Sequence, residues 1–182
     1  MATATQLMTA EDYARMPDLG FPTELVRGEV IRMNIPVPRH GQVCGRIDRL
    51  IGNFVDANRL GHVLTNDSGI ITERNPDTVR GGDVWYISYS KISAGPLPSG
   101  YLEVAPDIVF EVLSHSDRRS RLYRKIGEYL ALGVSVVCVV DPRNETVQLC
   151  TEDGEVNLSS SDDLTFPEQL PGFRVSVQAL FQ

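Results

Sequence analysis

The amino-acid sequence predicts a mixed α/β fold in which one central β-sheet is flanked by helices. Three patterns support this prediction. Apolar residues recur every three or four positions from His40 to Asn58, which indicates a long amphipathic helix. Residues Asp107 to Leu113 alternate as a strand does, and Val134 to Val140 is a continuous run typical of a central strand buried on both faces.

Length, charge and cysteine content set limits on the class of protein. The 182 residues, of which 42% are hydrophobic, fit one globular domain spanning residues 1–182. The formal net charge of -7 means that any nucleic-acid site has to be local. Cys44, Cys138 and Cys150 include no CxxC pair, which indicates reduced packing thiols in a cytosolic protein. No signal peptide or membrane span is apparent, so a cytoplasmic protein without a membrane partner is expected.

The chain is expected to begin with a short helix and a hairpin. Thr9 can cap a helix that ends near Met16 and Pro17. Glu24 to Met33 contains two short β-prone runs that join at Arg27 and Gly28, so a hairpin is predicted. The long helix follows, with its apolar stripe formed by Val43, Ile47, Leu50, Ile51 and Phe54.

The middle of the chain is expected to alternate strands with polar connections. Gly61 to Thr65 and Gly69 to Thr72 read as two strands separated by the turn-rich residues Asn66 to Ser68. Arg74 to Gly82 reads as a polar connection. Asp83 to Ser88 is then a strand with its acid at the leading end.

The second half should hold a helix, a second hairpin and a docked tail. Ser116 can cap a helix that follows the Asp107 to Leu113 strand. Glu145 to Cys150 is expected to pair with the β-branched run as a hairpin. Phe173 to Val177 alternates again, and the apolar residues 179–181 are expected to dock on the core.

Glu111 stands inside an apolar strand. The alternation places Ile108, Phe110 and Val112 on one face, and Asp107, Val109, Glu111 and Leu113 on the other. An ionised carboxylate is expensive to bury unless a metal ion, a cation or several donors meet it. Glu111 therefore needs a partner.

A basic segment follows that strand. Five cations lie between Arg118 and Lys125 after a single acid, Asp117, so these residues carry a charge of +4 in a chain of net charge -7. On the helix, Lys125 lies at the flank of the apolar face, where its long stem can present the amine beside the preceding strand. A lysine that is simply solvated remains the alternative.

Asp83 and Glu111 are carboxylates on two strands of similar character. If the strands are neighbours, the two acids can chelate Mg²⁺, which is usually bound by one or two carboxylates, waters and phosphate oxygens. Ordinary acids at strand ends are the alternative. His40, His62 and His115 show no zinc-ligand spacing with the cysteines, so a zinc site is not expected.

Several motifs together resemble a known family. Asp83 is followed by Glu111 in PDIVFEVLS and by Lys125 in a helix that ends EYLALGV, and the chain also contains ELVRGEV, PVPRH, LPSGYLEVAPD and VVDP. In this order the motifs are similar to those of the Uma-type endonucleases. These are bacterial proteins with the restriction-endonuclease-like, or PD-(D/E)XK, fold. The resemblance covers nearly the whole chain.

The resemblance implies a metal site. Asp83 would be the acid of the PD half-motif, and Glu111 the (D/E) of the second half. The main-chain carbonyl of Val112 would be a further metal ligand. Gly82 replaces the proline that usually precedes the first acid.

The resemblance also implies a catalytic lysine. Leu113 occupies the position at which the wider superfamily has its lysine. In the Uma-type family the following helix supplies this residue, which makes Lys125 the corresponding one. Glu24 and His40 match accessory positions of the family.

The function expected from this resemblance is Mg²⁺- or Mn²⁺-dependent hydrolysis of phosphodiester bonds in nucleic acid, with DNA as the expected substrate. Arg118, Arg119 and Arg121 would contact flanking phosphates, or else form a solvated helix face. A homodimer is expected, since this fold often pairs to reach both strands. The acidic overall charge keeps an alternative open, namely a non-catalytic nucleic-acid-binding or assembly module that retains the fold.

Overall fold

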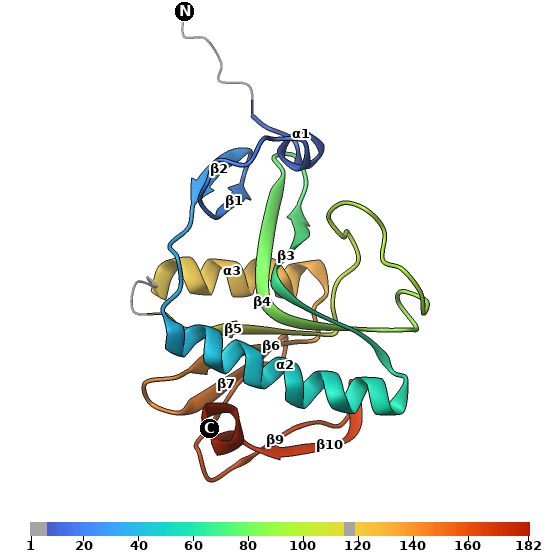
Figure 1. The fold of residues 1–182 in the computed structure, drawn as a ribbon, viewed down its shortest axis with the longest axis vertical. Coiled ribbons are helices and arrows are strands. Elements are labelled where there is room, and N and C mark those ends of the chain that lie inside the picture. Colours follow the sequence, from blue (N-terminus) through green and yellow to red (C-terminus); the bar gives the residue numbers. More distant parts are fainter. Residues whose placement is uncertain (1–6, 115–118) are drawn as a thin grey trace, which may run out of the picture.

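The computed structural model describes residues 7–114 and 119–182 and shows a central sheet between helices (Figure 1). The helices are α1 (Ala10–Ala14), α2 (Pro38–Asn58), α3 (Arg119–Leu132) and the 3-10 helix η1 (Val177–Phe181). The strands are β1 (Thr23–Val26), β2 (Glu29–Arg32), β3 (Gly61–Glu73), β4 (Thr78–Ser88), β5 (Ile108–Val112), β6 (Val136–Asp141), β7 (Thr146–Thr151), β8 (Gly154–Leu158), β9 (Asp163–Phe166) and β10 (Leu170–Ser176). The main sheet has the order β2-β1-β4-β5-β6-β7-β8, with β3 paired to β4, while β9 and β10 pair separately.

The two long helices cover opposite faces of the sheet (Figure 1). The α2 helix buries its predicted stripe, together with Val55, against the face that carries Phe110. The α3 helix packs Ile126 and Tyr129 against the face that carries Val109. The alternation along β5 therefore divides two apolar clusters, and the predicted α/β fold class is confirmed.

The strands β3 and β4 form one long antiparallel hairpin, which corrects two expectations. Residues Asn66 to Ser68 do not end a strand. They form a bulge, because Asn66 and Asp67 take positive φ values of 62° and 53° and the pairing shifts between Thr65 and Ser68. The prediction that Arg74 to Gly82 is a polar connection is also wrong, since only Arg74 to Asp77 form the turn.

Glycine at position 81 allows β4 to pass close to this bulge. A Cβ atom at Gly81 would lie 2.7 Å from the Cβ of Asp67, which is closer than side chains approach one another. Gly81, which resembled a loop residue in the sequence, therefore allows a close approach between two paired strands.

The strand β4 has an unpaired stretch along one edge. On that edge β1 pairs with β4 at Val79, and β5 pairs with it from Val84 to Tyr86. Neither strand pairs with Arg80 to Asp83, and we call this opening the β1–β5 gap. Asp83 therefore lies inside a long strand next to the gap, and not at the leading end of a strand as expected.

The other predicted elements agree with the structure in most respects. The hairpin at Arg27 and Gly28 is confirmed, and Leu180 and Phe181 in η1 are buried, which confirms the docked tail. Strands β8 and β9 were not anticipated, because β8 is mostly exposed and has no apolar alternation. The predicted cap at Ser116 lies outside the described residues.

Candidate functional site

A cavity of about 520 Å³ opens beside the β1–β5 gap. Its walls come from the β1–β2 hairpin, the following segment, the start of α2, the middle of β4, the end of β5 and the first turns of α3. The residues proposed from the sequence that line it are Glu24, His40, Asp83, Glu111, Val112, Arg121 and Lys125. The fold thus brings them together from five elements.

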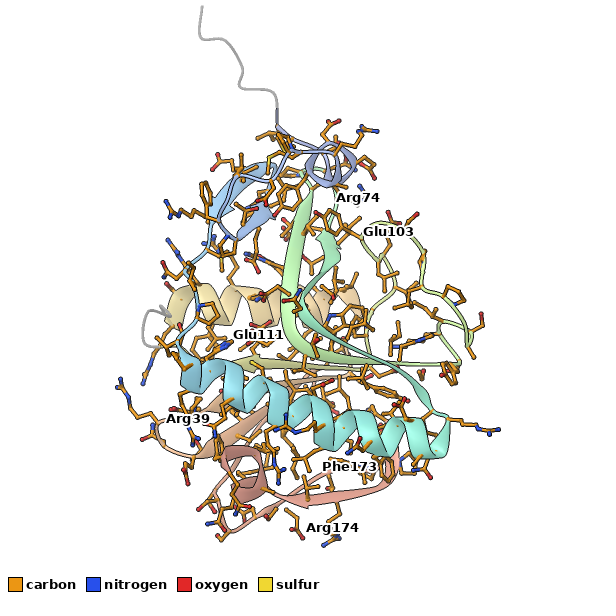
Figure 2. The ribbon with its side chains drawn as sticks, in the orientation of Figure 1. Arg39, Arg74, Glu103, Glu111, Phe173 and Arg174 are labelled. Atoms are coloured by element: carbon orange, nitrogen blue, oxygen red, sulfur yellow. The ribbon has the colours of Figure 1, made fainter. Side chains whose placement is uncertain are left out.

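Glu111 lies near the middle of the molecule (Figure 2) and bonds to two side chains of α3. Lys125 Nζ donates to Glu111 Oε2 at 2.8 Å, and the Tyr129 hydroxyl donates to Oε1 at 3.0 Å. Burial raises the pKa of Glu111 to about 8, although the Lys125 charge opposes this shift. The buried carboxylate therefore has a partner, as the sequence predicted, and this partner is a cation.

Lys125 also occupies the β1–β5 gap. Its ammonium donates to the Gly81 carbonyl at 2.8 Å and lies 3.2 Å from Glu24 Oε1, which in turn accepts from the Gly81 N–H at 3.2 Å. Burial lowers the pKa of Lys125, but the carboxylates of Glu111 and Glu24 outweigh it and raise the pKa well above its ordinary value. Along this edge of β4, side chains therefore supply the hydrogen bonds of the Gly81 N–H and C=O, because no strand pairs there.

A buried arginine extends this network. Arg80 donates from Nη1 to Glu24 Oε2 at 2.8 Å and, through Nε and Nη2, to both oxygens of Glu128 at 2.6 and 2.8 Å. All three side chains are at most 9% exposed. The arginine fork holds β1, β4 and α3 together at the floor of the site.

Sequence reasoning missed Arg80, Glu128 and Tyr129. Tyr129 carried a usable signal, because it lies one helical turn after Lys125 and so shares its side of α3. Arg80 and Glu128 carried no local signal, since their pairing joins residues 48 positions apart.

Asp83 is held by a main-chain N–H of β5 and by a histidine of α2. The Val112 N–H donates to Asp83 Oδ2 at 2.6 Å, and His40 Nε2 lies 3.3 Å from the same oxygen. The other ring nitrogen, His40 Nδ1, lies 3.4 Å from Cys44 Sγ. The contact with Asp83, followed by that with Cys44, raises the pKa of His40 to about 10 against the effect of burial.

The raised pKa of His40 predicts a pH-dependent contribution to stability. A histidine whose folded-state pKa is raised stabilises the fold fully below its unfolded pKa of about 6.5, and this contribution is lost as the pH rises toward about 10. We expect the difference in free energy of unfolding between wild type and His40→Gln to shrink over that range. Urea unfolding in EDTA at several pH values measures it, with His62→Gln as the matched histidine control. A difference that stays constant with pH would contradict the imidazolium assignment.

One further acid faces the cavity. The bulge in β3 places Asp67 in its wall, where burial and then the Asp83 charge raise the pKa of its carboxyl. In the sequence this residue read only as part of a turn. Bulges commonly redirect a side chain next to a functional site.

The predicted phosphate contacts are only partly gathered at the cavity. Arg121 lines it and is exposed, and so is Arg124 on the next turn of α3. Arg119 is exposed but is not among the lining residues, and Arg118 lies outside the described residues. Arg27 and Arg32, which belong to the β1–β2 hairpin, also line the cavity and were not anticipated.

The site provides oxygen ligands of the kind that Mg²⁺ prefers. Asp83 and Glu111 line the same cavity, and the Asp83 charge is felt at Glu111. Within a strand the N–H and C=O of one residue point to the same edge. Because the Val112 N–H reaches Asp83, the Val112 carbonyl also faces the β1–β5 gap. The donor set therefore fits a hard divalent cation.

A family comparison agrees with these observations. A family model named Uma2 and described as "Putative restriction endonuclease" matches residues 10–178. The chain belongs to the Uma2 family. The family resemblance seen in its motifs is thereby confirmed, and Uma2 membership supports a nuclease-like function that acts on nucleic acid.

A solved structure shows the same fold as this Uma2 chain. It is described as a "putative nuclease belonging to DUF820" from Anabaena variabilis. The two chains are 18% identical and superpose with a TM-score of 0.83, over 96% of this chain and 97% of the other. No curated protein matches the chain. Within the described ranges, no helix has the length and apolarity needed to cross a membrane.

Proposed function

We propose that this protein is a Mg²⁺- or Mn²⁺-dependent endonuclease that hydrolyses phosphodiester bonds of nucleic acid, with DNA as the expected substrate. One observation carries the proposal. Asp83, Glu111 and Lys125 come from β4, β5 and α3, yet all three line one cavity, and Lys125 is bonded to Glu111.

Asp83, Glu111 and the Val112 carbonyl would hold the metal ion. When bound, Mg²⁺ neutralises phosphate charge and lowers the pKa of a bound water. The Val112 N–H and His40 fix the orientation of Asp83 through its Oδ2 atom. The Tyr129 hydroxyl fixes the orientation of Glu111 through its Oε1 atom.

Lys125 would orient the attacking water and stabilise the negative charge that develops on the phosphate. An ammonium has three donors, and Glu111, Gly81 and Glu24 supply three acceptors for them. Contact with water or phosphate therefore requires the release of one of these acceptors. The same three groups hold the cation at a fixed position, which is what electrostatic catalysis requires.

Arg121 and Arg124 would bind phosphates on either side of the scissile bond. Both are exposed, and both line the cavity on α3 beside Lys125. The chain as a whole carries a charge of -7, so these contacts have to attract the polyanion locally. Binding should accordingly weaken as salt concentration rises.

The test combines cleavage with metal binding. We expect cleavage of plasmid or single-stranded DNA in Mg²⁺ or Mn²⁺ and none in EDTA. In a calorimetric titration, Asp83→Asn should bind Mn²⁺ at least about tenfold more weakly than wild type, because a ligand is lost. Absence of cleavage, together with Mn²⁺ binding that is unchanged in Asp83→Asn, would contradict the proposal and favour the non-catalytic module.

A further inference from the structure

The start of α2 places a second set of metal-ligating atoms beside Asp83. His40 and Cys44 are four residues apart on α2, so they project from one face one turn apart. His40 Nε2 lies 3.3 Å from Asp83 Oδ2, and Cys44 Sγ lies 3.4 Å from His40 Nδ1. The sequence did not predict a zinc site, and it is the fold that brings Asp83 to this histidine and cysteine.

The two contacts involve different ring nitrogens of His40, and only one of these nitrogens can bind a given ion. One ligand atom from each of His40, Cys44 and Asp83 can be chosen so that all three lie within 4.8 Å of one another. Tetrahedral zinc, with bonds of about 2.0–2.3 Å, holds its ligand atoms about 3.3–3.8 Å apart. The limit of 4.8 Å exceeds this spacing by at most about 1.5 Å, so side-chain adjustments of that order would close the site around an ion.

The donor types differ from those of the proposed Mg²⁺ site. A thiolate and an imidazole select borderline or soft ions such as Zn²⁺ and Cd²⁺, whereas Mg²⁺ takes oxygen ligands. His40 and Asp83 line the cavity, so a fourth position would open toward it. Asp83 is the one residue that the two donor sets share.

We propose that His40, Cys44 and Asp83 bind a thiophilic divalent cation of the Zn²⁺ class, and that this ion competes with Mg²⁺ for Asp83. The first part stands on the three side chains alone. The second part rests on the proposed nuclease function, and its consequence is that Zn²⁺ inhibits cleavage. The alternative is that Cys44 has only a packing role, since it is partly buried against the core cluster under α2.

Titration of the full chain with Cd²⁺ tests binding directly, because a cadmium–thiolate bond gives a charge-transfer absorption band in the ultraviolet. We expect the band to saturate at one equivalent in wild type and to be absent in Cys44→Ser. Cys150→Ser is the matched thiol control and should keep the band. Glu111→Gln should keep it as well, because only the Mg²⁺ donor set is altered.

A second variant keeps the test informative if Cys44→Ser does not fold. His40→Gln retains the thiol and should bind Cd²⁺ at least about tenfold more weakly, with a circular dichroism spectrum like that of wild type. The proposal is overturned if wild type shows no band, or if the band survives in Cys44→Ser.

Inhibition provides the second measurement. Zn²⁺ should inhibit Mg²⁺-dependent cleavage by wild type, and Cys44→Ser should retain cleavage while needing at least about tenfold more Zn²⁺ for the same inhibition. Equal sensitivity of the two proteins would overturn the competition. Failure of the proposed nuclease function can be distinguished from failure of cation binding. In that case wild type cleaves no DNA, whatever the Cd²⁺ titration shows.

Discussion

Replacing Glu111 with glutamine is expected to lower the rate of Mg²⁺-dependent DNA cleavage at least about 100-fold, or about 2.7 kcal/mol in activation free energy. Glutamine keeps the size of the side chain and an oxygen for Lys125, but it removes the negative charge that the proposed metal ion would need. Glu111 is 7% exposed and held by Lys125 and Tyr129, so the replacement has little room to rearrange.

Initial rates on plasmid DNA at saturating Mg²⁺ provide the measurement. The matched control is Glu155→Gln on the exposed edge strand β8, which should cleave as wild type does. Melting temperatures of the two variants show whether both are folded. Cleavage by Glu111→Gln at the wild-type rate would remove Glu111 from the proposed site.

Replacing Arg80 with methionine is expected to destabilise the protein by about 3–5 kcal/mol, the usual cost of leaving a buried charge without its partner. Glu24 would keep its contacts with Lys125 and the Gly81 N–H. Both oxygens of Glu128 would lose the guanidinium that holds them. Methionine fills much of the same volume, so the loss reflects charge more than packing.

Urea unfolding of wild type and variant gives the difference in free energy. The double variant Arg80→Met with Glu128→Gln should recover part of the loss, because the stranded carboxylate is then neutral. Arg174→Met is the matched control. Its ion pair with Asp163 is exposed, so the cost should stay below about 1 kcal/mol. Equal costs for Arg80→Met and Arg174→Met would contradict the buried network.

Elements with a strong hydrophobic period were predictable from the sequence. The stripe along α2 and the alternation along β5 each report local burial, so they identified both helix-facing clusters correctly. The position of Glu111 in an apolar strand also predicted that it needs a partner, which could be a metal ion, a cation or several donors. The resemblance to the Uma-type family then named Lys125, which does contact Glu111 in the structure.

The predictions that failed concern residues whose type is typical of a turn or loop but which lie within strands. Asn66 and Asp67 are typical turn residues, yet they bulge within β3 and do not end it. Arg80 and Gly81 resemble a polar loop, yet they lie in a central strand that pairs with β3 on one edge and contacts distant side chains on the other. No local pattern encodes such long-range compensation, so Arg80 and Glu128 emerge only from the three-dimensional arrangement.

The β1–β5 gap has a consequence for how this protein can vary. At most sheet positions, neighbouring strands supply hydrogen bonds through the main chain, and these survive almost any exchange of side chain. At Gly81 those hydrogen bonds come from Glu24 and from Lys125, the lysine proposed to take part in phosphodiester chemistry. Substitution of either residue is thus expected to disturb the hydrogen bonding of β4 as well as the proposed catalysis. A relative without the proposed cleavage activity would therefore still need this acid and this lysine to hold the strand.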